Sequence, residues 1–253
     1  MSGHSQFKNI MHRKGAQDAR KGKIFNKIAR EIMVAAKCGM PDPASNTRLR
    51  TAIAVAREAN MPRDRIDRAI KAGSPGGEDS AVYENIRYEG YGPGGVAIIV
   101  EALTENRNRT AAEVRATFGK RGGAMGEMGS VAFMFDRIGT IFYPAGKVSF
   151  DDLFEVAVEA GADNVEETED GLEVTTAPES FHAVRDVLVA KFGEPESSSI
   201  GWRPNITATP NEEQAETLMG LIETLEENDD VQNVFGNYDI PDDVMQRIAD
   251  KAK

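Results

Sequence analysis

The sequence predicts an α+β multidomain protein: an N-terminal three-helix domain followed by two α/β sandwich domains, one of them ferredoxin-like and inserted in the other. Three observations lead to this fold class. Helical periodicity dominates the first part of the 253-residue chain, strand-like and helical segments alternate after it, and a complete βαββαβ series separates the last strand-like segment from its expected partners. The expected domains are 1–75, 80–137 together with 205–240, and the insert 138–204.

The N-terminal region shows the spacing of three helices. Apolar residues recur at helical intervals over 23–37 and 46–60, and Asn46 is a candidate cap for the second helix. A third helix is expected from Pro62, which suits a first helical position, to Gly73, which suits the residue just past a helix. The first 22 residues are rich in glycine and polar side chains, which is typical of an arm with at most partial helix. The turn-rich stretch "SPGGEDS" (74–80) then marks a boundary.

The first sandwich domain is expected from strands and helices that lie on both sides of the insert. Its predicted elements are the strands "IRYEGYG" (86–92), "GVAIIVEAL" (95–103) and "SVAFMF" (130–135), a helix over 107–120, a helix over 212–227 and a strand "VQNVFGNY" (231–238). The tail completes this unit if its strand returns to the strands before the insert.

The insert has the element order of a ferredoxin-like sandwich. After Asp136 the pattern predicts a strand over 140–144, a helix over 150–160, strands over 163–167 and 172–176, a helix over 179–192, and an extended stretch toward Trp202. This order, βαββαβ, is the split βαβ arrangement.

Positive charge is concentrated at the N-terminal end of an acidic chain. The formal net charge is −11, yet residues 1–75 hold 16 Lys or Arg against 6 Asp or Glu, a balance of +10, and the remainder holds 14 against 35. This separation favours a polyanionic partner for the first domain, and nucleic acid is the best candidate. The alternatives are an acidic protein or membrane partner and an ordinary solvated surface. The candidate nucleic-acid-binding residues here are Lys8, Arg13, Lys14, Arg20, Lys21, Lys23, Lys27 and Arg30.

A second candidate anion site lies in "NRNRT" (106–110). This stretch opens a helix directly after a strand, so Arg107 and Arg109 are expected beside backbone N–H groups that already favour anions. Helix capping by solvated side chains is the alternative interpretation.

Other motifs argue against enzymatic chemistry. "GYGPGG" (90–95) matches G-x-G-x-x-G, but a strand follows it instead of a helix, so a tight link between strands is the better interpretation. Cys38 has no second thiol, and the histidines His4, His12 and His182 form no catalytic or metal-binding pattern. The acidic clusters 166–170 and 226–230 are expected to be solvated loops, and binding of a divalent ion is the alternative. We therefore expect no enzyme activity, cofactor or metal site.

The chain has no apolar run long enough to span a bilayer and no apolar secretory core, so we expect a cytoplasmic protein with no membrane partner. The oligomeric state is not defined by the sequence.

Five stretches carry a resemblance to a known family: "SGHSQFKNIMHRKGAQDARKGKIFNKIAREI" (2–32), "YEGYGPGG" (88–95), "NRNRT" (106–110), "GSVAFMF" (129–135) and "DDVQNVFGN" (229–237). In this order they resemble the YebC/PmpR family, which also includes the mitochondrial translational activator of cytochrome c oxidase. One departure is Phe7, where many members have Trp. The resemblance covers essentially the full chain.

The resemblance implies a helical N-terminal domain, two α/β domains, and a non-enzymatic role that uses nucleic acid. Members are DNA-binding transcriptional regulators or ribosome-associated factors that assist the translation of proline-rich stretches. We therefore expect a regulator of gene expression that binds duplex DNA through its basic N-terminal domain. The alternative is a translation factor that binds ribosomal RNA and has the ribosome as its partner.

Overall fold

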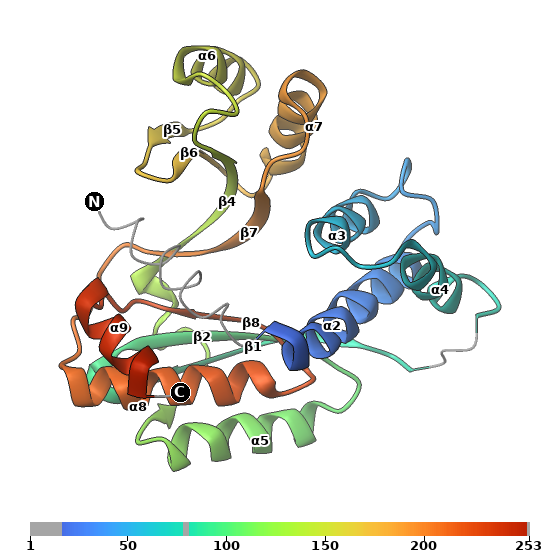
Figure 1. The fold of residues 1–253 in the computed structure, drawn as a ribbon. Helices are drawn as coiled ribbons and strands as arrows, with labels where there is room; N and C mark the ends of the chain where they lie inside the picture. Colours follow the sequence, from blue (N-terminus) through green and yellow to red (C-terminus); the bar gives the residue numbers. More distant parts are fainter. Residues whose placement is uncertain (1–16, 78–80, 252–253) are drawn as a thin grey trace.

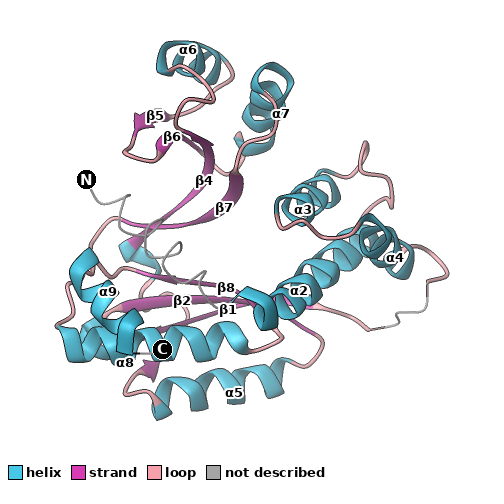
Figure 2. Ribbon diagram, viewed as in Figure 1, coloured by secondary structure: helices cyan, strands magenta, loops and turns pink. Residues whose placement is uncertain are grey.

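The computed structural model describes residues 17–77 and 81–251, which form three parts around a common centre (Figure 1). One part is a helical unit of α2, α3 and α4. The other two parts each contain a four-stranded sheet with helices packed on it, and within the described residues all strands belong to these two parts (Figure 2). The N-terminal helical region and the two α/β parts confirm the expected fold class.

The helical unit consists of α2 (Gln17–Cys38), α3 (Thr47–Glu58) and α4 (Arg63–Gly73). They bury a small apolar cluster around Ile32, Leu49 and Ile66, each no more than 6% exposed. Asn46 caps α3 as predicted, because its side-chain oxygen accepts a hydrogen bond from the Leu49 N–H at 3.0 Å. Pro62 is the residue before α4 and not its first helical residue, a difference of one position.

Helix α2 is longer than predicted. Residues 17–22 were expected within the loose arm, but they form the first turns of this helix. Gly22 disfavours helix by about 1 kcal/mol relative to alanine. Extending an existing helix adds one backbone hydrogen bond per residue without a new nucleation step, which outweighs that cost.

The first sheet has the strand order β3-β1-β2-β8, built from β1 (Glu84–Tyr91), β2 (Ala97–Thr104), β3 (Ala124–Met125) and β8 (Val231–Gly236). All its pairs are antiparallel, and β8 pairs with β2 across the intervening chain, as expected. The link between β1 and β2 is a short 3-10 helix in which Gly94 and Gly95 have φ of 74° and 71°, so this stretch is the predicted tight connection between strands.

Helices α5 (Arg107–Lys120) and α8 (Glu212–Glu227) cover one face of this sheet (Figure 1). Their apolar sides meet β2 in a core that includes Val100, Phe118 and Leu221, all of which are fully buried. Helix α9 (Asp242–Lys251) lies beyond the predicted elements and adds Met245 to the same core.

The stretch 130–135 was predicted to be a strand, and this is wrong for most of it. Ala132–Met134 form a 3-10 helix, and β4 (Phe135–Pro144) begins only at Phe135. The cause is the buried carboxylate of Glu89, which accepts hydrogen bonds from the N–H groups of Val131 and Ala132, both at 2.9 Å. These donors serve a side chain from β1 and cannot take part in a strand ladder.

The second sheet has the strand order β5-β6-β4-β7 and is antiparallel throughout. Its elements follow β4 as α6 (Phe150–Glu159), β5 (Asn164–Glu167), β6 (Gly171–Thr176), α7 (Phe181–Phe192) and β7 (Ser197–Pro204). Both helices pack on one face over a core that includes Ile141, Leu153 and Phe181. This is the predicted ferredoxin-like arrangement, and it lies in the chain between β3 and α8. The exact domain boundaries stay a prediction.

Candidate nucleic-acid interface

The structure describes six of the ten predicted site side chains. Lys8, Arg13 and Lys14 lie outside the described residues, and so does the side chain of Arg20, although its backbone belongs to α2. The six that remain are Lys21, Lys23, Lys27 and Arg30 on α2, and Arg107 and Arg109 at the start of α5. Several of them make contacts within the molecule.

Lys23 and Lys27, in the first half of α2, contact the C-terminal end of α8. Lys27 Nζ donates to the carbonyl oxygen of Glu226 at 2.6 Å, and Lys23 Nζ lies 3.4 Å from that of Glu227. The last carbonyls of a helix lack intrahelical partners and carry the negative end of the helix dipole. Helix α8 has no basic residue in its own last turn, so α2 supplies the cations that complement this end.

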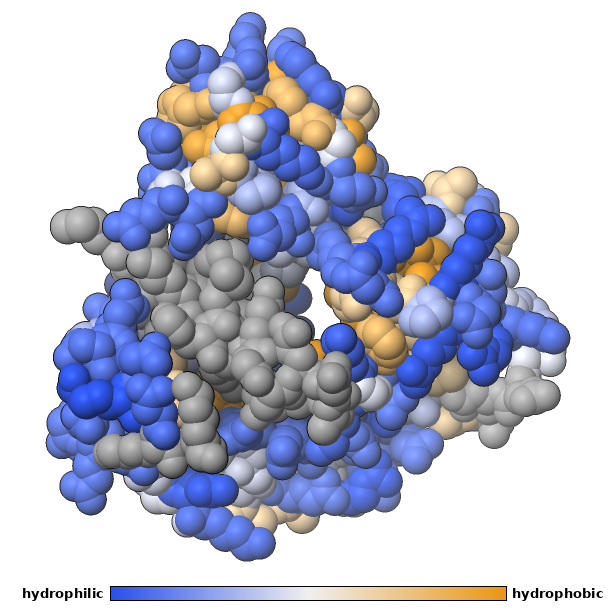
Figure 3. Space-filling view, in the orientation of Figure 1, coloured by the Kyte–Doolittle hydropathy of each residue, from blue (hydrophilic) through white to orange (hydrophobic). Residues whose placement is uncertain are grey.

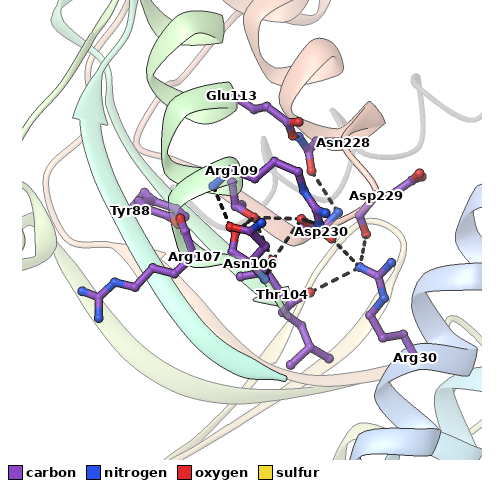
Figure 4. A network of polar contacts seen from close by, with 12 residues as sticks. Arg30, Tyr88, Thr104, Asn106, Arg107, Arg109, Glu113, Asn228, Asp229 and Asp230 are labelled. Atoms are coloured by element: carbon purple, nitrogen blue, oxygen red, sulfur yellow. Dashed lines mark hydrogen bonds and ion pairs between the residues drawn. The ribbon is translucent and has the colours of Figure 1, made fainter. Parts of the chain in front are cut away.

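Arg30 continues the contact one turn further along α2. Its Nη1 donates to the carbonyl oxygens of Asp229 at 2.8 Å and Leu103 at 3.3 Å, and to the carboxylate Oδ1 of Asp230 at 2.9 Å (Figure 4). Its guanidinium also lies 5.6 Å from the ring centroid of Tyr83. Arg30 therefore binds the loop after α8 and the end of β2 at once.

Asp230 is the acceptor on which two of the predicted site residues meet. Its side chain is buried, and its second oxygen, Oδ2, accepts from Arg109 at 2.7 Å, Thr110 at 2.8 Å and Thr104 at 3.1 Å. Burial alone would raise the pKa of this carboxyl group, but the hydrogen bonds from Arg109, Thr110 and Thr104 lower it below its ordinary value. The carboxylate therefore stays charged at neutral pH.

The two arginines of the predicted second anion site point in different directions. Asn106 caps α5 through a hydrogen bond from the Arg109 N–H at 3.1 Å, as expected for a helix start. The Arg109 side chain turns toward Asp230, whereas the exposed Arg107 side chain extends away from it (Figure 4). The structure thus brings Arg30 and Arg109 together and leaves Arg107 apart.

We name residues 226–230 the acidic corner. The sequence predicts a solvated loop here, which is wrong for Asp230, since its exposed fraction is 5%. The corner is also fastened to its own part of the molecule: Asn228 donates to the Glu113 carboxylate at 2.7 Å, and Leu103 N–H donates to the Asp230 carbonyl at 2.7 Å. The sequence signal for the pairing role of Asp230 was the pair Asp229–Asp230 directly before the predicted strand 231–238.

A second polar contact joins the helical unit to α7 and β7 of the second sheet-bearing part. On α3, Arg50 pairs with Asp186 at 3.2 Å, and the Thr51 hydroxyl lies 3.1 Å from His182 Nδ1. Ser198 donates to the Glu58 carboxylate at 3.2 Å. Burial lowers the pKa of His182, which favours its neutral form. His182 is partly buried at this contact.

Among the residues that the structure describes, no three His, Cys, Asp or Glu side chains are grouped so that they could hold a metal ion. No helix within the described ranges is both long and apolar enough to cross a membrane.

Comparison with known proteins identifies relatives of both the helical region and the sheet-bearing parts. A family model described as the TACO1/YebC protein N-terminal domain matches residues 5–76, and a model of the TACO1/YebC second and third domain matches residues 83–238. A crystal structure of a conserved hypothetical protein from Aquifex aeolicus is 45% identical, with a TM-score of 0.78, covering 89% of this chain and 93% of that one. The matches extend from the basic N-terminal residues to the end of β8, and the chain belongs to the TACO1/YebC family.

Proposed function

We propose that this protein is a nucleic-acid-binding regulator of gene expression that contacts phosphates through its N-terminal residues and α2. Membership of the TACO1/YebC family supports a regulatory role. The observation that carries the proposal is the separation of charge, +10 over residues 1–75 in a chain of −11. A domain with this balance attracts a polyanion, and the acidic remainder limits non-specific adhesion.

Duplex DNA is the first candidate ligand, bound through Lys8, Arg13, Lys14, Arg20 and Lys21. The cations of α2 that contact the acidic corner, Lys23, Lys27 and Arg30, also belong to this proposed surface. Arg107, exposed at the start of α5, is a secondary phosphate contact in this proposal. The binding is electrostatic in the first instance, so its affinity should fall steeply with salt concentration.

Ribosomal RNA is the second candidate, and the surface of α4 favours it. A recognition helix that enters the major groove presents side chains free to contact bases. The exposed face of α4 instead pairs Arg63 with Asp67 and Arg68 with Asp64, so carboxylates alternate with its arginines. Recognition of RNA by its shape and its unpaired bases needs no such helix.

The proposal assigns no catalytic residue and no cofactor to the protein. An assay for nuclease, phosphatase and nucleotide hydrolysis, with and without magnesium, tests this part. Sustained turnover that one carboxylate substitution abolishes would show that the protein is an enzyme.

Co-sedimentation with ribosomes at physiological salt, with excess duplex DNA as competitor, tests the ligand. The variant Lys8→Glu/Arg13→Glu/Lys14→Glu leaves every described contact intact. Its matched control, Arg115→Glu/Lys120→Glu/Lys191→Glu, makes the same change in net charge on exposed residues of α5 and α7. Binding that resists DNA and is lost only in the first variant identifies RNA. Binding that DNA abolishes identifies DNA, and equal loss in both variants contradicts the proposed surface.

A further inference from the structure

We propose that the acidic corner is an intramolecular competitor of nucleic acid: it holds Lys23, Lys27 and Arg30 of α2 until phosphates replace it. This inference rests on the proposed function and concerns the regulation of that same surface. Lys23, Lys27 and Arg30 of α2 already donate hydrogen bonds to oxygen atoms of the acidic corner.

The contact presents to α2 the chemistry that a nucleic-acid backbone would present. Lys23, Lys27 and Arg30 lie on successive turns of one helix face, and each donates to carbonyl or carboxylate oxygens of the corner. Phosphate oxygens accept from the same donors and carry more charge. One set of side chains cannot satisfy both acceptors at once, so the two contacts exclude each other.

Side-chain charge contributes to the hold on the helix. Burial lowers the pKa of Lys27, but the negative charges of Glu226 and Asp229 act in the opposite direction and favour its charged form. These two carboxylates therefore attract the lysine without forming its hydrogen bond, which goes to the Glu226 backbone. They can be neutralised without removing a backbone acceptor.

The corner itself is built to remain in place when α2 leaves. Asp230 uses Oδ1 for Arg30 and Oδ2 for Arg109, Thr104 and Thr110, which belong to the same part of the molecule as the corner. Loss of Arg30 therefore leaves the buried carboxylate paired with Arg109. This lowers the cost of opening, because no unpaired charge stays buried.

The helical unit can separate without exposing a hydrophobic core. Among the described residues, no apolar cluster contains side chains of both the helical unit and a sheet-bearing part. The contacts of α3 with the second sheet-bearing part include polar ones, such as the pair of Arg50 with Asp186 of α7. The space-filling view also shows an opening between the three parts (Figure 3). Polar interfaces of this kind permit relative motion of domains.

The variant Glu226→Gln/Asp229→Asn tests the competition. It removes two charges from the corner and keeps the backbone acceptors and Asp230. The matched control, Asp151→Asn/Glu155→Gln, removes two charges from the exposed face of α6. With a fluorescent mixed-sequence DNA duplex and, separately, a ribosomal RNA fragment as probes, we expect the corner variant to bind about three- to tenfold more tightly than the control. Equal affinity of the two variants overturns the proposal.

A distance measurement separates this inference from the proposed function. Cys38 is the only cysteine and is exposed near the end of α2, and Ala112→Cys adds a second label site on the exposed face of α5. Energy transfer between the two labels should decrease when either probe binds. Binding with unchanged transfer overturns the competition and leaves the proposed function intact. Absence of binding to both probes in all variants overturns the proposed function, and this inference with it.

Discussion

Asp230 illustrates at the scale of one residue how a short acidic side chain can organise a charged surface. Its two carboxylate oxygens receive arginines from different parts of the molecule, Arg30 from α2 and Arg109 from α5, at 2.9 and 2.7 Å. Two threonine hydroxyls complete its shell. A buried carboxylate is tolerated only with such partners, since unpaired burial of a charge is costly.

Replacing Asp230 should destabilise the protein more than replacing its neighbour. Asp230→Ala removes the acceptor of two arginines and two threonines and should lower the free energy of unfolding by about 1–3 kcal/mol, a range that allows for the partly exposed arginines. Asp229→Ala removes an exposed side chain and should cost less than about 0.5 kcal/mol. Urea unfolding measures both. Equal losses would show that the Asp230 carboxylate contributes no specific stability.

The stability loss caused by Asp230→Ala should depend on pH. The pKa of Asp230 is lowered in the folded protein, so its contribution is complete above the ordinary value of about 3.9. The contribution is lost as the pH falls through the lower folded value, because protonation removes the charge that binds the arginines. The stability difference between wild type and Asp230→Ala should therefore be constant near neutral pH and decrease below about pH 4. A difference that grows on acidification would contradict the lowered pKa.

At the scale of elements, glycine positions decide how closely the helices of the helical unit pack. A Cβ atom at Gly73 would lie 2.0 Å from the Met33 carbonyl oxygen of α2, whereas one at Gly22 would meet no atom within 4 Å. The end of α4 therefore approaches the backbone of α2 at a distance that only glycine permits.

The two glycines should respond to alanine in opposite directions. Gly73→Ala must push α4 away from α2 and should destabilise the protein by about 1–3 kcal/mol, as overpacking does. Gly22→Ala gains helix propensity at an open position and should stabilise α2 by about 0.5–1 kcal/mol. Thermal unfolding followed by circular dichroism compares the pair. If Gly73→Ala leaves the stability unchanged, α4 can move away from α2 without a loss of free energy of unfolding.

For the whole molecule, the important feature is that the apolar core of the helical unit is separate from the two sheet-bearing parts, which share an apolar cluster that includes Ile99, Phe135 and Trp202. The core of the helical unit is small and rich in alanine, whereas β2 contributes Ile98, Ile99 and Val100, all fully buried, to the first sheet. Units with separate cores can open independently, and the smaller core opens at a lower free energy.

Hydrogen exchange should therefore distinguish the helical unit from the sheet-bearing parts. Amides of α3 should exchange earlier than those of β2, because opening the helical unit leaves the sheets folded. Addition of a nucleic-acid ligand should change exchange in α2 and the acidic corner before it changes exchange in β2. Mass spectrometry of peptic peptides measures this order. Equal protection of α3 and β2 would show that the molecule opens as one cooperative unit.

Much of the fold could be predicted from the sequence because local pattern determines it. Periodicity predicted α3 and α5 closely, a single side chain identified the cap at Asn46, and the order of elements predicted the ferredoxin-like sheet. The glycines of 90–95 indicated a link between strands for a steric reason, since Gly94 and Gly95 adopt positive φ. Each of these depends on residues close together in the chain.

The tertiary structure alone decided what the basic residues of α2 contact. Lys27 and Glu226 are 199 positions apart, and Arg30 and Asp230 are 200 apart, so no local pattern could pair them. The same holds for residues 130–135, where Glu89 from a distant strand takes the backbone donors of a predicted strand. The sequence by itself determined where the positive charge lies along the chain. Only the folded structure decided which oxygens neutralise it, because hydrogen bonds and ion pairs depend on distance in space and not on separation in sequence.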